Sequence, residues 1–403
     1  YGYPLGSAHH FGYRFELGPS MITLPAVYRD LFIKTGAPLE EVVDLQPVDV
    51  AREFVFSDGT RITTPGVGLP AFAHAIAESL GESAAQEWRA LMRSTASYWS
   101  AVRQDYLHAP RSSGFGIFNV LKLHGISALS FALDSATSRL NKFTDTRLAS
   151  MAEYLLLAHD IRPKKSSELA FVWPYVEQEF GLWQIDGGAS ALADALYQRC
   201  IERGVKFDFN VYNVDSSHYS DVAVDEMRFK DKLPNVAFSN AYVICAALNG
   251  SIGLAAFETV FLPSSDIPCD VGAIAITSAT PSAAESQPQQ GIRIAVPAPR
   301  VQLVTHEEQQ RYAHKVFDEL ASRGLDIRDL VSDFFTYVPT QMWTRGNDFQ
   351  RFGRSGRDNR SNRKGVYRVG GDAHPGGGAE FSLMGAEIVA DLVRADFPKS
   401  KSK

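Results

Sequence analysis

Short apolar stretches and longer amphipathic stretches alternate along the chain, and they divide it into expected strands and helices. Two short runs with alternating apolar and polar side chains, residues 53–56 and 61–64, flank Asp58-Gly59, and this pattern predicts a β-hairpin. Residues 241–247 are apolar throughout, as in a buried strand. Between residues 69 and 157, apolar positions recur at spacings of four and seven, which predicts a mainly helical region. The mixture of periods predicts an α/β or α+β fold.

Further elements are predicted from capping residues and glycine stops. Gly187-Gly188 precedes an expected helix over 189–203 that ends at Gly204. Thr305 and Glu308 have the spacing of a capping box at the start of another helix, which ends at Gly324. Expected strands cover residues 12–18, 205–209, 293–296, 301–304 and 366–369, and a last helix covers 383–392.

Composition narrows the class of protein without naming a function. A chain of 403 residues with 45% hydrophobic and 21% charged residues is typical of a globular protein of two to three domains. The net charge of −6 argues against a general nucleic-acid binder. Three distant cysteines (Cys200, Cys245 and Cys269) indicate no disulfide framework, which is consistent with the cytoplasm. No signal peptide or spanning segment is visible, and the first residue, Tyr1, suggests a fragment or a processed chain.

The strongest local motif lies near the C-terminus, where residues 369–378 read Val-Gly-Gly-Asp-Ala-His-Pro-Gly-Gly-Gly before a helix. A strand, a glycine-rich turn and a helix N-terminus favour an anionic or electron-rich ligand, because backbone N–H groups point toward it. Asp372 has the chemistry to hydrogen-bond the hydroxyls of a sugar or ribityl chain. A plain tight connection is the alternative. Gly18-Pro19-Ser20 and Gly187-Gly188 are weaker signals of the same kind.

Several other chemistries find no support in the motifs. The ten histidines show no His-Glu-x-x-His spacing and no cluster with carboxylates, so no metal site is expected. Neither a Gly-x-Ser-x-Gly motif nor a P-loop is present. His374 is interpreted as a structural turn residue rather than a general base, and Asp145 with Arg147 as a surface pair. A series of arginines favours either a solvated loop or a contact with anionic lipid or phosphate: Arg351, Arg354, Arg357, Arg360 and Arg363.

Taken together, the motifs resemble those of flavin-dependent phytoene desaturases and related carotenoid oxidoreductases, within the amine-oxidase-like flavoprotein superfamily. The matching segments are collinear with the family and spread over nearly the whole chain. They are GYRFELGPSMITLPAVYRDLF (12–32), FSDGTRI (56–62), FTDTRLASM (143–151), YVEQEFGLWQIDGGASALADAL (175–196) and VYRVGGDAHPGGGAEFSLMGAEIVADL (366–392).

This resemblance implies an α/β fold of the two-dinucleotide-binding-domain type with an inserted α+β substrate domain. The FAD-binding domain would comprise residues 1–20, 180–245 and 365–398, and the substrate domain residues 21–179 and 246–364. The implied cofactor is FAD, and the implied reaction is desaturation of a long isoprenoid such as phytoene. The family's flavin accepts the hydride, and no side chain stands out as a catalytic base.

The resemblance also assigns cofactor-binding residues. Gly18, Pro19 and Ser20 would lie beside the flavin. Gly371 and Asp372 would hold the ribityl or pyrophosphate region. The pyrimidine edge of the flavin would face the last group of residues, where helix N–H groups stabilise negative charge: Gly377, Gly378, Ala379, Glu380 and Phe381.

The chain also departs from the family pattern. The N-terminal strand, Gly-x-Gly-x-x-Gly and helix that hold the FAD pyrophosphate are absent from this sequence, so that βαβ unit is expected to be missing. Ala149 stands where the family often has an arginine. Two alternatives therefore stay open: a related amine oxidase or protoporphyrinogen-type oxidase, and a truncated, non-enzymatic homologue that is unable to hold FAD.

An apolar segment over residues 115–131 favours a lipophilic substrate. It contains Phe118, Leu121, Leu129 and Phe131 and the single basic residue Lys122. Because a polyene is insoluble in water, this segment predicts peripheral contact with the inner face of a membrane, supported by the arginine series. The alternative interpretation is an ordinary pair of core helices.

Overall fold

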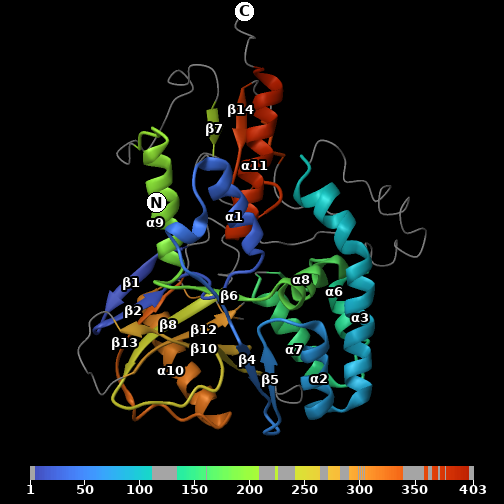
Figure 1. The fold of residues 1–403 in the computed structure, drawn as a ribbon. Coiled ribbons are helices and arrows are strands. Elements are labelled where there is room, and N and C mark those ends of the chain that lie inside the picture. Colours follow the sequence, from blue (N-terminus) through green and yellow to red (C-terminus); the bar gives the residue numbers. More distant parts are fainter. Residues whose placement is uncertain are drawn as a thin grey trace, which may run out of the picture.

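The structure, a computed structural model, combines one large sheet with helices and three small sheets. It describes residues 5–110, 134–159, 161–207, 223–225, 241–263, 271–281, 290–297, 299, 301, 303, 305–338, 358–361, 365–370, 373–376 and 378–398. Figure 1 shows the large sheet in the lower half, a group of helices beside it, and further helices above it. The mixed α/β fold expected from the sequence is therefore confirmed.

Seven strands form the large sheet in the order β13-β8-β12-β10-β9-β4-β5. Neighbouring strands are antiparallel except β4 and β9, which are parallel. The predicted hairpin is confirmed, since Val55 pairs with Arg61 across the Asp58-Gly59 turn. The strands are β4 (Val50–Val55), β5 (Arg61–Pro65), β8 (Ala241–Leu248), β9 (Glu258–Phe261), β10 (Ile274–Ser278), β12 (Gln290–Pro297) and β13 (Val331–Tyr337).

Different elements cover the two faces of this sheet. Helix α10 (His306–Ser322) packs Val316 and Leu320 against residues such as Ile244 and Ile294 on one face. The predicted capping box is present at its start, with Thr305 and Glu308 bonding reciprocally. On the other face, Val243 and Cys245 pack against strand β2.

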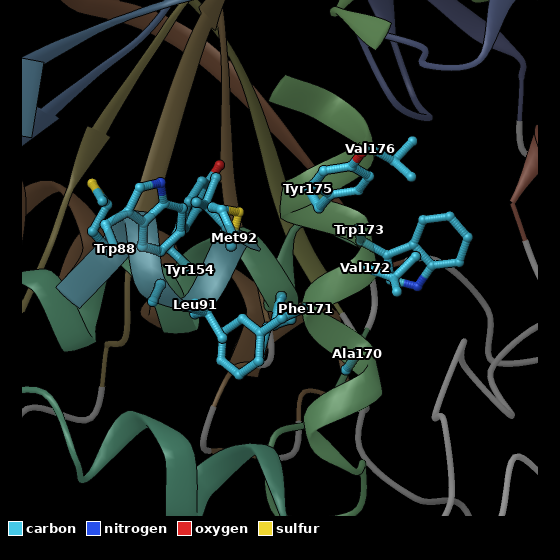
Figure 2. Packing of buried hydrophobic residues seen from close by; sticks show 14 of the residues in the cluster. Trp88, Leu91, Met92, Tyr154, Ala170, Phe171, Val172, Trp173, Tyr175 and Val176 are labelled. Atoms are coloured by element: carbon cyan, nitrogen blue, oxygen red, sulfur yellow. The ribbon is translucent and has the colours of Figure 1, made fainter. Parts of the chain in front are cut away.

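A cluster of helices continues the core from the β4–β5 end of the sheet. They are α2 (Leu69–Leu80), α3 (Glu82–Ala101), the π-helical η2 (Val102–Leu107), α6 (Ala136–Leu140), α7 (Thr146–Leu157), the 3₁₀ turn η4 (Glu168–Phe171) and α8 (Val172–Phe180). Figure 2 shows Trp88 and Met92 on one side of α8, whereas Trp173 projects from α8 on the opposite side. The helical prediction for residues 69–157 is confirmed over 69–107 and 136–157, and the segment 115–131 lies outside the described residues.

Helices, together with the strands β7 and β14, lie above the large sheet in Figure 1, and the strands β1 and β2 lie at its left side. β1 (Ser7–His10), β2 (Tyr13–Glu16) and β11 (Thr280–Pro281) form an antiparallel sheet, β3 (Leu45–Pro47) pairs with β6 (Trp183–Ile185), and β7 (Ala223–Asp225) pairs in parallel with β14 (Val366–Arg368). The helices here are α1 (Pro25–Thr35), the 3₁₀ turn η1 (Leu39–Glu41), α9 (Ala189–Glu202) and α11 (Ala379–Asp396).

Two predicted strands are wrong over the residues described, and one helix begins earlier than predicted. Val205 donates its backbone N–H to the Cys200 carbonyl, so it closes the C-terminus of α9 and does not begin a strand over 205–207. The described residues of 301–304 are not extended into a strand either. α11 begins at Ala379 rather than at 383 because Gly378, at φ +103°, supplies its N-cap.

One expected domain boundary, between residues 245 and 246, falls inside β8. This strand pairs along nearly its whole length with β12 and β13, and seven of its eight residues are buried. Because a strand bonded on both sides cannot be divided between domains, β8 belongs entirely to the large sheet.

Candidate cofactor site

The glycine-rich motif ends at Gly378, which is the N-cap of α11. Gly378 is exposed and no side chain caps the helix. A Cβ atom at this position would lie 3.3 Å from the Phe381 ring and 3.4 Å from the Glu380 carboxylate. Glycine therefore leaves the N-cap position without a side chain, while the Glu380 carboxylate interacts with its own backbone N–H in the first turn. Gly371, Asp372 and Gly377 lie outside the described residues.

The loop between β2 and α1 approaches the same helix start. Within this loop, Gly18 is buried, Pro19 is exposed and Ser20 is partly buried. A little further along, the Thr23 N–H donates to the Glu380 carboxylate at 3.3 Å. The segments that hold the first and the last sequence motifs thus meet in space, as the resemblance implies.

Two residues at this junction were missed by sequence reasoning. Tyr28 of α1 is fully buried, and its hydroxyl lies close enough to the Glu380 carboxylate to lower the pKa of that group, although the two do not reach hydrogen-bond geometry. Burial raises the pKa of Tyr28 well above its usual value, and Glu380 raises it further, so the hydroxyl stays protonated. Tyr28 and Thr23 gave no separate signal, because a tyrosine on the apolar face of a helix is typical of a core position.

Glu380 itself lies in the first turn of α11, near His159. Burial is the strongest influence and raises the pKa of Glu380. The backbone N–H of Glu380, His159, the Thr23 N–H and the Tyr28 hydroxyl act in the opposite direction without cancelling it. The candidate site therefore contains a carboxyl that is harder to ionise than an ordinary glutamic acid.

A second helix N-terminus, that of α9, is occupied by a side chain of the protein. The Glu16 carboxylate lies so close that a Cβ at Gly188 would fall 2.0 Å from one of its oxygens. Burial raises the pKa of Glu16, while Arg14 and the backbone N–H groups of Ser190 and Ala189 lower it in part. The Gly187-Gly188 sequence thus accommodates an internal carboxylate.

A polar cavity of about 380 Å³ lies beside the start of α9. It opens between strand β1 and the first turn of α9, and Arg14 and Asp194 place opposite charges in its wall. It is lined by Leu5, Gly6, Ser7, His9, Arg14, Ser190, Ala193 and Asp194.

A buried ionic cluster joins the large sheet to the helical core. Arg52 of β4 makes two hydrogen bonds to Glu177 of α8, at 2.7 and 3.0 Å, and a third to Glu258 of β9, at 2.8 Å. Arg52 and Glu177 are each only 4% exposed. Although burial opposes both charges, the two carboxylates raise the pKa of Arg52, and the positive partners lower that of Glu177 to about 2.

The cluster continues toward α11. A ring nitrogen of His159 lies 2.9 Å from Glu177. The His159 ring is 5.8 Å from the Trp173 ring, which meets the Phe381 ring edge-on at 4.4 Å. The first turn of α11 is therefore packed against the segment that carries the ionic cluster.

Comparisons with known proteins agree with this architecture. No family model matches the chain. It is 23% identical to the 4,4'-diapolycopene oxygenase of Methylomonas sp., over 96% of this chain and 89% of the relative. It is 24% identical to a 4,4'-diapophytoene desaturase of Staphylococcus aureus, over 49% of this chain and 39% of that relative.

Solved structures show the same fold at low sequence identity. A double mutant of putrescine oxidase is 13% identical, with a TM-score of 0.55, and the match covers 96% of this chain and 90% of the other. A putative protoporphyrinogen oxidase from Exiguobacterium sp. is 12% identical, with a TM-score of 0.53 over 97% and 89% of the two chains. The chain therefore shares the fold of these oxidases, and its sequence is similar to those of the oxygenase and the desaturase named above.

Two other predictions from the sequence concern residues with contacts in the structure. His374 is buried, its Nε2 lies 3.0 Å from the Ala109 carbonyl, and its own carbonyl accepts a hydrogen bond from Asn359, as suits a structural turn residue. Asp145 caps α7 and pairs with Arg147 at 2.8 Å, which confirms the predicted pair.

Only one arginine of the series, Arg360, lies among the described residues. Arg360 pairs with Asp396 at the end of α11, and the other four arginines lie outside the described residues. Over the part of the chain that the structure describes, no three metal-binding side chains gather at one place. No described helix combines the length and the apolar character that a bilayer span needs.

Proposed function

We propose that the protein is an FAD-dependent oxidoreductase that desaturates a long isoprenoid such as phytoene. The observation that carries this proposal is the similarity to 4,4'-diapolycopene oxygenase along nearly the whole chain. The partial match to 4,4'-diapophytoene desaturase supports the same substrate class. The amine oxidase structures support the fold alone at 13% identity, so they do not favour an amine substrate.

The described residues suit a flavin at the start of α11. The exposed glycine N-cap leaves room for close approach, and the N–H groups of the first turn favour an electron-rich ring edge. In the proposed arrangement, the loop of Gly18, Pro19 and Ser20 lies beside the flavin, and Ala379 to Phe381 face it. Gly371, Asp372 and Gly377 complete the site through the family resemblance. When bound, FAD would supply the acceptor for the hydride.

The proposed cofactor and substrate domains are divided so that the large sheet lies within one of them. Residues 1–20, 180 to the residue before β8, and 365–398 would form the cofactor domain. The substrate domain would comprise residues 21–179 and the chain from β8 to residue 364, which include the large sheet and the helical core.

Flavin retention tests the proposal. The full-length protein, as encoded by its gene, is expected to purify yellow with flavin absorbance. Asp372→Ala should weaken FAD retention about tenfold to a hundredfold, because a hydrogen bond to a charged group contributes about 1.5–3 kcal/mol. The measurement is flavin dissociation on dilution, followed by fluorescence.

The control for this test is Asp391→Ala. Asp391 lies on the exposed side of α11 and pairs with Arg394, so its replacement should leave retention unchanged. A colourless wild-type protein would count against the proposed function. Full occupancy in Asp372→Ala would remove Asp372 from the site.

We further propose peripheral contact with a membrane through residues 115–131, because a long isoprenoid partitions into lipid. Flotation with liposomes should show binding that is stronger with anionic lipid, at about 1 kcal/mol per basic residue near the surface. Phe118→Asp should reduce binding about tenfold, since burying a phenylalanine contributes about 1.5–3 kcal/mol.

The matched control is Val67→Asp, at an apolar residue that is 52% exposed elsewhere on the surface. This variant should float like the wild type. If Phe118→Asp unfolds the protein, as judged by circular dichroism, the segment is part of the core and the membrane proposal is wrong.

A further inference from the structure

We propose that Glu380 takes up a proton when a flavin at the start of α11 is reduced, so that the carboxyl and the flavin change charge together. This inference rests on the proposed function, because it requires a flavin at that position. The inference gives Glu380, which follows the glycine-rich segment 369–378, a role beyond cofactor binding.

The position of Glu380 makes its charge sensitive to a neighbouring ligand. The carboxylate lies in the first turn of α11 and accepts the Thr23 N–H at 3.3 Å. The titratable groups that act on it from neighbouring elements are Tyr28 of α1 and His159, which follows α7. His159 is itself held by Glu177 at 2.9 Å. A new charge beside the start of α11 would therefore act on a carboxyl whose ionised form burial already disfavours.

Burial makes this carboxyl easier to protonate than an ordinary glutamic acid. Burial penalises the ionised form and raises the pKa of Glu380 despite the polar groups around it. Reduction of the flavin by a hydride adds one negative charge within the same partly buried site. Like charges at short range disfavour each other, so reduction raises the pKa of Glu380 further.

The overall step balances in atoms and electrons. Two neighbouring C–H bonds of the substrate break: one carbon gives a hydride to the flavin, and the other gives a proton. The electron pair left by the proton forms the new C=C bond. The substrate is oxidised, the flavin is reduced by two electrons, and the Glu380 carboxylate becomes a carboxylic acid. The net charge of the site does not change.

The test is the reduction potential of the bound flavin as a function of pH, in wild-type protein and in Glu380→Gln. Each proton bound per two electrons shifts the equilibrium tenfold per pH unit, which corresponds to 29.6 mV. We expect the wild-type potential to fall more steeply than that of Glu380→Gln, by one proton, over the pH range in which Glu380 titrates. Glu387→Gln, on the same helix but paired with Lys34 at the surface, should follow the wild type.

The outcomes separate this inference from the proposed function. If the wild type and Glu380→Gln both bind flavin and their potentials change equally with pH, the role of Glu380 is overturned and the proposed function still stands. A wild-type protein without flavin would overturn both. If Glu380→Gln does not fold, Tyr28→Phe gives the same test. It removes a hydroxyl that lowers the pKa of Glu380, so the steeper range should move to higher pH, and an unmoved range would overturn the inference.

Discussion

Replacing Arg52 by alanine is expected to lower the free energy of unfolding by about 3–5 kcal/mol, because removing one partner of a buried ion pair leaves the other charge uncompensated. The guanidinium of Arg52 bonds Glu177 in two places and Glu258 in a third, inside the interface between the large sheet and α8. Without it, two carboxylates would face each other in a region nearly closed to water.

Denaturation in urea, monitored by circular dichroism, measures this effect. Arg61→Ala is the matched control: Arg61 is on the adjacent strand β5, it pairs with Glu53, and its side chain is 57% exposed. Glu53 is only 7% exposed, but the Arg61 end of this pair is open to water, so the loss should be clearly smaller than for Arg52→Ala. Adding Glu177→Gln to Arg52→Ala should restore part of the lost free energy of unfolding, since it removes one of the two buried carboxylates left without the arginine. Equal effects of Arg52→Ala and Arg61→Ala would show that the cluster is not a source of stability.

This cluster also marks the limit of what the sequence predicts. The hairpin at Asp58-Gly59 and the capping box at Thr305 are encoded within a few residues, and both were predicted. Arg52, in contrast, meets partners 125 and 206 positions away in the chain. The identity of a buried ionic partner depends on tertiary packing, and a single sequence carries no local signal for it.

The candidate site divides in the same way. A glycine-rich turn before the last helix was predicted, and Gly378 is the N-cap of α11, because backbone conformation is a local property. The contact between Thr23 and Glu380 joins residues 357 positions apart, and Tyr28 completes the junction from the buried face of α1. The Gly187-Gly188 signal was local too, but its occupant, Glu16, comes from a distant strand. Glycine motifs therefore predict where helices begin, whereas tertiary packing determines which carboxylate or ligand lies at each helix N-terminus.

Lowering the pH should reduce the free energy of unfolding, because Glu177 becomes protonated. The positive partners lower the pKa of this carboxyl in the folded state to about 2, against 4.5 for an ordinary glutamic acid. A depressed folded-state pKa contributes stability that is fully present above the unfolded value. That stability is lost as the pH falls from 4.5 through 2. For Glu177 the loss is on the order of 3 kcal/mol.

Glu177→Gln isolates this contribution, because every other titrating group is shared with the wild type. That includes Glu16 and Glu380, whose raised pKa values act with the opposite sign. Between pH 5 and pH 2, the free energy of unfolding should fall less steeply in Glu177→Gln than in the wild type, even though the variant starts lower. Glu179→Gln, at an exposed position of α8, should keep the wild-type slope. Parallel curves for Glu177→Gln and the wild type would mean that the Arg52 cluster does not hold Glu177 ionised.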